Sequence, residues 1–180
     1  MKRAGLLVGM LLGTGALADT GLNELSIDQS FQVRATVVQG CLLGSGSSDA
    51  SSFGSIAFGQ FATLASDIQV SSSQGAGSIV LQCTPGAAVS IALNTGGYAS
   101  DVGGGRFLGK GSERLRYQLF QDVANSQVWG DGGNGGTALS VSFPLSGGVQ
   151  SYPVYARLFS VSPMPSAGLY SDTVTVTISY

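Results

Sequence analysis

The chain has 180 residues, of which only 10% are charged, and its formal net charge at pH 7 is −2. It contains no histidine, which excludes Ser-His and Cys-His nucleophiles, and its two cysteines are too few ligands for a metal site. Its few basic residues are scattered through an acidic chain, so nucleic acid is not an expected partner. Low charge with abundant glycine, serine and valine is typical of exported β proteins rather than of disordered chains.

Residues 1–18 are predicted to be a signal peptide. Residues 1–3 (Met-Lys-Arg) are charged, residues 6–17 are mostly apolar, and residues 16–18 (Ala-Leu-Ala) form a cleavage site. The apolar run is too short to span a bilayer, which takes about 20 residues. We expect the exported chain to begin at Asp19 with six basic and ten acidic residues, a net charge of −4.

Cys41 and Cys83 are predicted to form a disulfide. An even number of cysteines in an exported chain usually pairs, because the compartment is oxidising. The bond closes a loop of about 40 residues, which stabilises a fold by about 3–4 kcal/mol on the loop-entropy model.

The segment from Ile27 to Cys41 alternates apolar odd positions with polar even positions. This period of two is typical of a half-buried strand. The pattern continues for roughly three times the usual strand length of about 5–6 residues. We therefore ask whether all of it belongs to one fold.

Strand-like runs follow along the rest of the chain, with turn residues between them and no helical period. The runs are residues 53–61, 78–83, 88–94, 114–122, 128–129, 137–143, 152–159 and 172–180. Residues 94–112 are expected to be a glycine-rich turn. Strands at this spacing predict an all-β fold, a sandwich of immunoglobulin-like type.

The closing run, residues 172–180, keeps its full alternation up to the last residue. Its apolar side chains share one face: Val174, Val176, Ile178 and Tyr180. No further strand follows to pair with it, so we expect something else to cover its edge. Ordinary core packing in a complete sandwich remains the alternative for these residues.

Other motifs have simpler interpretations. The glycine runs match no phosphate-binding loop, and the segment from Asp131 to Asn134 lacks the spacing of a calcium loop. Trp129, with the aromatic residues Tyr98, Tyr152 and Tyr155, is a candidate sugar-stacking platform, although a lone Trp in a sandwich more often packs in the core. The carboxylates lie mostly in turns, so catalytic residues, metal ligands and cofactors are not expected.

Several segments taken together resemble a known family. They are residues 53–59 (FGSIAFG), 91–97 (IALNTGG), 115–122 (LRYQLFQD), 128–132 (VWGDG) and 167–180 (AGLYSDTVTVTISY). The chain is similar over about residues 31–180 to the spore coat protein U domain, the subunit domain of archaic (Csu-type) chaperone–usher pili. Two positions depart from the family pattern. Residues 106–108 (Arg-Phe-Leu) stand where an Arg-x-Met-like element is expected, and Ala156 stands where such domains often have a glycine before the arginine.

The resemblance implies an incomplete immunoglobulin-like sandwich whose last strand is supplied in trans. A periplasmic chaperone would lend a strand, and an outer-membrane usher would exchange it for the N-terminal strand of a neighbouring subunit. The chain would be exported through the periplasm to the cell surface as a structural subunit, not an enzyme, with no small-molecule substrate. It would support surface attachment and biofilm formation.

The resemblance also suggests roles for individual residues. With the border set near Gln29-Ser30, residues 19–30 form a donor-strand extension and residues 31–180 form the pilin domain, whose first strand is 31–41. The expected donor residues are Leu22, Leu25 and Ile27. The expected groove or chaperone-facing residues are Phe31, Val33, Val174, Val176, Ile178 and Tyr180.

Three other functions remain as alternatives. A tip adhesin or carbohydrate-binding module would bind glycans and depend on Trp129. A secreted spore or cyst coat protein is allowed by the family name. A secreted hydrolase with paired carboxylates has the least support, since such pairing is spatial and leaves no sequence signature.

Overall fold

The computed structural model describes residues 28–180. The expected signal peptide and the expected donor residues Leu22, Leu25 and Ile27 lie outside this range. The chain divides into two units with the border between Thr36 and Val37. Residues 28–40 belong to no strand or helix.

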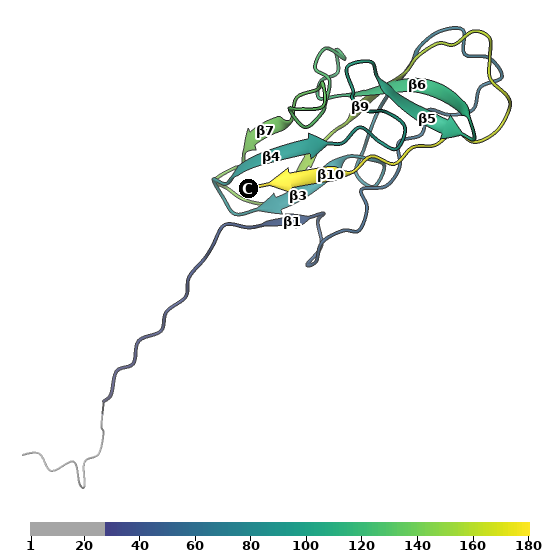
Figure 1. Ribbon diagram of the computed structural model, residues 1–180. Coiled ribbons are helices and arrows are strands. Elements are labelled where there is room, and N and C mark those ends of the chain that lie inside the picture. The colour runs from purple at the N-terminus through teal and green to yellow at the C-terminus, as the bar shows by residue number, and fades with distance from the viewer. Residues whose placement is uncertain (1–27) are drawn as a thin grey trace, which may run out of the picture. The chain divides into compact units, whose positions relative to one another are not determined.

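The described residues contain ten strands and no helix (Figure 1). The strands are β1 (Cys41–Leu43), β2 (Ile68–Ser71), β3 (Ile79–Cys83), β4 (Ala88–Leu93), β5 (Arg106–Lys110), β6 (Glu113–Phe120), β7 (Leu139–Ser142), β8 (Gln150–Tyr152), β9 (Tyr155–Leu158) and β10 (Val176–Ser179). They form three antiparallel sheets in the orders β1-β3-β8, β10-β4-β7 and β2-β9-β6-β5. The predicted all-β fold is confirmed, and the arrangement agrees with an immunoglobulin-like sandwich.

Alternation of apolar and polar residues explains the strongest strands. In β4, Val89, Ile91 and Leu93 are buried while the residues between them are less so. In β6, Leu115 and Tyr117 are likewise buried on either side of the exposed Arg116. Side chains that alternate in this way place one face of each sheet on a shared core.

One hydrophobic core joins the three sheets. Its buried members include Leu81 from β3, Ile91 from β4, Leu119 from β6, Leu158 from β9 and the loop residue Phe143. Aliphatic and aromatic burial on this scale is the main favourable term in folding. The predicted disulfide is confirmed as well: Cys41 and Cys83 are cross-strand partners in β1 and β3 and are bonded.

Several expectations about strands are wrong. The expected first strand over residues 31–41 is only Cys41–Leu43, since residues 31–40 belong to no strand and apolar side chains among them, such as Val37 at 85%, are exposed. The run 53–61 is not a strand either, and its only ladder contact is a bridge between Gly54 and Ala76.

Some strands were not expected. The supposed turn 94–112 contains β5, which pairs with β6 from Arg106–Tyr117 to Lys110–Glu113. Pairing with the long, regularly alternating strand β6 therefore outweighs the low strand propensity of the glycines in this segment. The two-residue turn between them begins at Gly111, whose φ of 56° suits the first central position of a type II′ turn. The short strands β2 and β8 also had no clear sequence signal.

Candidate strand-binding groove

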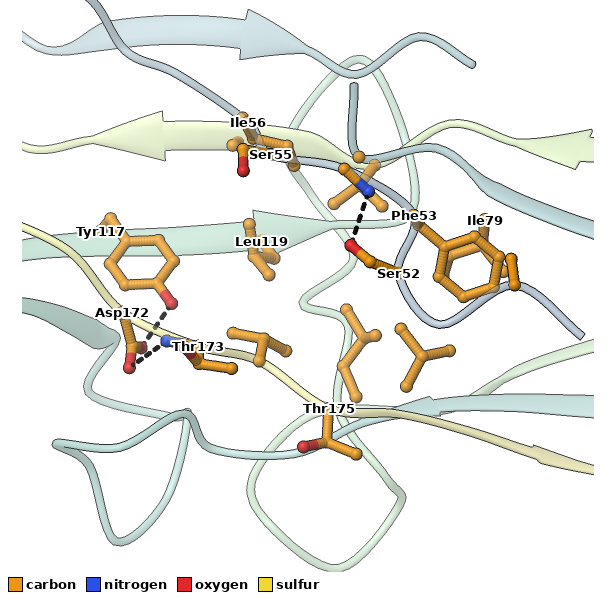
Figure 2. Close-up of a pocket in the computed structure, with 18 of the residues that line it drawn as sticks. Ser52, Phe53, Ser55, Ile56, Ile79, Tyr117, Leu119, Asp172, Thr173 and Thr175 are labelled. Carbon is orange, nitrogen blue, oxygen red and sulfur yellow. Dashed lines mark hydrogen bonds between the residues drawn. The ribbon is translucent and has the colours of Figure 1, made fainter. Parts of the chain in front are cut away.

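A cavity of about 600 Å³ opens between two segments of the domain (Figure 2). One wall is the segment 50–58, which includes Ser52, Phe53 and Ile56, and the other is the segment 172–176 that leads into β10. The floor consists of apolar side chains from several strands: Ile79, Leu93, Leu108, Leu119, Val154 and Ala156. These floor side chains are buried except for the half-buried Leu108, so the cavity reaches down to the domain core between its two walls.

A strand edge without a partner lies at this cavity. Within the described residues, β10 pairs only with β4. The outer edge of β1 is closed at Leu43, whose amide donates to Asp49 Oδ1 and whose carbonyl accepts from the Ala50 amide. Figure 1 shows β10, in yellow, alongside β4. Leu43 of β1 and Val176 of β10 both line the cavity. An edge strand presents free N–H and C=O groups, which are a template for another strand.

Asp172 fixes the start of the β10 wall. Its Oδ2 accepts a 2.7 Å hydrogen bond from the Tyr117 hydroxyl, and its Oδ1 accepts 2.8 Å bonds from the amides of Gly97 and Thr173. Burial raises the pKa of Tyr117 above its ordinary value, and the hydrogen bond to the carboxylate raises it further. Gly96 leaves room for this carboxylate, because a side chain there would collide with it. This contact ties the wall to the floor at Tyr117.

A buried polar cluster lies near the floor. Arg106 is fully buried, and its Nη2 donates to the carbonyls of Asn94 (2.7 Å) and Trp129 (2.8 Å). Its Nη1 donates to Gln118 Oε1 at 2.7 Å, and Gln118 in turn donates to the carbonyl of Val102. Burial lowers the pKa of Arg106. The cluster joins the end of β4 to β5 and β6, so it holds the strands that supply the floor.

The expected groove residues are distributed unevenly. Val174 and Val176 line the cavity wall. Ile178 packs against the core, and Tyr180 is 58% exposed. Phe31 and Val33, in the other unit, are 86% and 83% exposed. The assignment of these residues to a groove or a chaperone stays a prediction.

Sequence reasoning missed several residues that line the cavity, above all Phe53 and Ile56. They come from a segment that belongs to no strand, so no periodicity marks the side chains that face the core. The only sequence signal for these two residues is that 53–61 contains several large apolar side chains, which a solvent-exposed turn does not need. Leu119 and Ala156 lie in runs that were predicted to be strands. Nothing in the sequence pattern of these runs distinguishes a residue on the cavity floor from an ordinary core residue.

The other candidate sites are resolved by burial and hydrogen bonding. Trp129 is fully buried and its Nε1 donates to the Ile91 carbonyl at 2.9 Å, which confirms the core interpretation and rules it out as a sugar platform. Asp131 accepts hydrogen bonds from the amides of Gly133 and Asn134, as in an Asx turn. Residues 28–180 contain no group of three or more His, Cys, Asp or Glu placed to hold a metal ion. They also contain no helix with the length and apolar character to cross a membrane.

Comparison with known proteins gives one family and one structural similarity of note. A family model described as Spore Coat Protein U domain matches residues 27–177. A search of curated proteins gives no match. Among solved structures, the chain is similar to one in the CsuC–CsuE chaperone–tip adhesion subunit pre-assembly complex from archaic chaperone–usher Csu pili of Acinetobacter baumannii. The sequences are 22% identical with a TM-score of 0.49, over 81% of this chain and 41% of that chain.

Proposed function

The chain belongs to the spore coat protein U domain family, and we propose that it is a structural subunit of a chaperone–usher pilus whose sandwich is completed by a strand from another chain. The observation that carries this proposal is the cavity of about 600 Å³ between the walls 50–58 and 172–176. Its floor is apolar, and the unpaired edge of β10 lies at one wall. These are the requirements for β-strand addition, in which the backbone of the added strand pairs with an edge and its alternate side chains fill pockets.

An unfilled groove of this kind is an aggregation hazard, because it combines a free strand edge with apolar wall residues that are only half-buried. This favours a partner that covers the groove from export until assembly. A periplasmic chaperone fills that role in our proposal, and an outer-membrane usher replaces it with a strand of the next subunit. The finished fibre lies at the cell surface, where it supports attachment and biofilm formation.

The segment before β1 supplies the replacing strand in this proposal. Phe31, Val33 and Val37 alternate with polar residues and are 86%, 83% and 85% exposed. The chain becomes anchored only near Gly40, whose amide donates to Thr84 Oγ1 at 3.0 Å and whose carbonyl accepts from the Thr84 amide at 2.9 Å. We therefore extend the donor segment from the expected residues 19–30 as far as Val37. Phe31 and Val33 then belong to the donor and not to the acceptor groove.

Complementary variants test this assignment. The donor-defective chain is Phe31→Asp with Val33→Asp, and the groove-defective chain is Ile56→Asp with Val174→Asp at two half-buried wall positions. Each variant alone should fail to form fibres, because one lacks an apolar strand and the other lacks an apolar groove. A mixture should form a 1:1 heterodimer that native mass spectrometry detects, since each chain retains what the other lacks.

The matched control places the same charges on the polar side of the same segment, as Gln32→Asp with Thr36→Asp. This chain should polymerise like the unaltered one. Fibres from the donor-defective chain would contradict the donor assignment. A mixture that stays monomeric, although both variants are folded with intact disulfides, would contradict strand addition into this groove.

A further inference from the structure

The exposed cationic side chains of residues 37–180 all lie on one sheet. This part of the chain has five basic residues, and Arg106 is fully buried. The other four are Lys110 at the end of β5, Arg114 and Arg116 on β6, and Arg157 on β9, which are strands of the sheet β2-β9-β6-β5. In a chain whose net charge is negative, this sheet is therefore a local region of positive charge.

Only two of these four cations lack an acidic partner. Lys110 Nζ lies 3.3 Å from Glu113 Oε2, and Arg157 Nε lies 3.3 Å from Asp67 Oδ2. Arg114 and Arg116 form no ion pair with any carboxylate in the described part of the chain. Two positions apart on one strand, they point to the same side about 7 Å from each other. They leave two adjacent positive charges unneutralised.

Aromatic rings hold both of these guanidinium groups. The Arg116 guanidinium lies 4.0 Å from the centre of the Phe159 ring, and the Arg114 guanidinium lies 4.2 Å from that of Tyr98. Tyr98 reaches this place because Gly109 has no side chain, since a Cβ there would collide with the ring. Stacking restricts each side chain. Arg114 Nη1 also donates to the carbonyls of Gly111 (2.7 Å) and Glu113 (2.8 Å), so its Nε and Nη2, together with the donors of Arg116, are the ones without an acceptor in the described part of the chain.

We propose that these four residues, Tyr98, Arg114, Arg116 and Phe159, form a binding strip for a linear polysaccharide that bears carboxylate groups. Each guanidinium presents donors in the fork geometry that matches a carboxylate. Tyr98 remains 45% exposed, which leaves part of an aromatic ring to pack against the C–H face of a sugar. A narrow chain with regularly spaced carboxylates fits two cations in a row along β6.

Other anionic partners fit the strip less well. Two free arginines neutralise too few phosphates to hold nucleic acid against the negative charge of the whole chain. An acidic protein surface would need a central apolar patch, and Tyr98 is the only large apolar side chain of the strip that is strongly exposed. The strip is also separate from the groove, so this inference does not depend on strand addition.

Binding to polygalacturonate tests the proposal with the full chain. Arg114→Gln with Arg116→Gln should weaken binding by about tenfold or more, since charged hydrogen bonds are lost at both positions. The matched control, Lys110→Gln with Arg157→Gln, removes the same charge from the same sheet but only from cations that are already paired. It should bind within about twofold of the unaltered chain, and added salt should weaken all binding.

Fully methyl-esterified polygalacturonate keeps the sugar backbone without the charge and should not bind. The proposal is overturned if the unaltered chain does not bind polygalacturonate, or if it binds the methyl ester equally well. Equal losses in the two double variants would show a general charge effect in place of a strip. Tighter binding to a DNA duplex than to polygalacturonate would assign the strip to nucleic acid.

Discussion

Replacement of Arg106 by methionine tests how much the buried polar cluster contributes to stability. The change removes every hydrogen bond that the guanidinium donates and leaves the carbonyls of Asn94 and Trp129 without this donor. Gln118 Oε1 loses one donor and keeps the Leu119 amide at 3.0 Å. The cost therefore comes mainly from the buried carbonyl of Trp129, with a smaller part from the carbonyl of the exposed residue Asn94, and not from the glutamine.

The Trp129 carbonyl is a buried acceptor, which costs about 1–3 kcal/mol when it loses its partner, and the carbonyl of the exposed residue Asn94 adds less. Methionine offsets part of this cost, because it no longer buries a charge and it fills a similar volume. We expect a net loss of about 1–3 kcal/mol in the free energy of unfolding. That is a large share of the roughly 5–15 kcal/mol that typical domains have.

Urea unfolding with the disulfide intact, followed by the fluorescence of the single tryptophan, measures this loss. Trp129 is a suitable reporter because its own carbonyl is one of the acceptors of Arg106. The control is Arg114→Met, the same change at an exposed position, where loss of the stacking on Tyr98 should cost only about 0.5–1 kcal/mol. An unfolding midpoint for Arg106→Met equal to that of the control would refute the reasoning.

The remaining predictions concern pH and the disulfide. Because the pKa of Tyr117 is raised in the folded state, this group stabilises the fold below pH 10.0, its ordinary pKa, and the contribution is lost as the pH rises further. Tyr117→Phe should therefore flatten the fall in the urea unfolding midpoint above pH 10.0. Hydrogen bonds from the hydroxyl and amide of Ser166 lower the pKa of Glu113 to about 2, so its contribution is present above pH 4.5 and is lost as the pH falls towards 2. An NMR titration of the Glu113 carboxyl carbon checks this, and a midpoint near 4.5 would contradict it. The double variant Cys41→Ser with Cys83→Ser removes the disulfide between residues 42 apart and should lower the free energy of unfolding by about 3–4 kcal/mol. Urea unfolding measures this loss, and an unchanged midpoint would contradict the loop-entropy reasoning.

The sequence predicts those strands in which apolar and polar side chains alternate within the strand itself. Val89, Ile91 and Leu93 mark β4 without any knowledge of the fold. β5 was missed because Gly109 interrupts its pattern, and its pairing with β6 is visible only in three dimensions. The alternation before Cys41 was recognised but misplaced, since a period of two shows that a segment is amphipathic and not which chain supplies its partner.

The same limit applies to the groove. Val174 and Val176 were predicted because they continue the alternation of a strand with a free edge. Phe53 and Ile56 lie opposite them on a segment without regular structure, so their role depends on tertiary packing that no local pattern encodes. The strip around Arg116 likewise depends on Phe159, which lies far along the chain.

The link between Cys41 and Cys83 has a mechanical consequence in a fibre assembled as proposed. Tension that passes from one subunit to the next enters the domain where the exposed segment ends, just before β1. With only Cys41–Leu43 in its ladder, β1 held by hydrogen bonds alone would peel away from β3 one residue at a time. The covalent link at the first pair of that ladder transfers the pull directly to β3, a strand with four buried residues, so stretching must disrupt the core before the chain can unravel from its end.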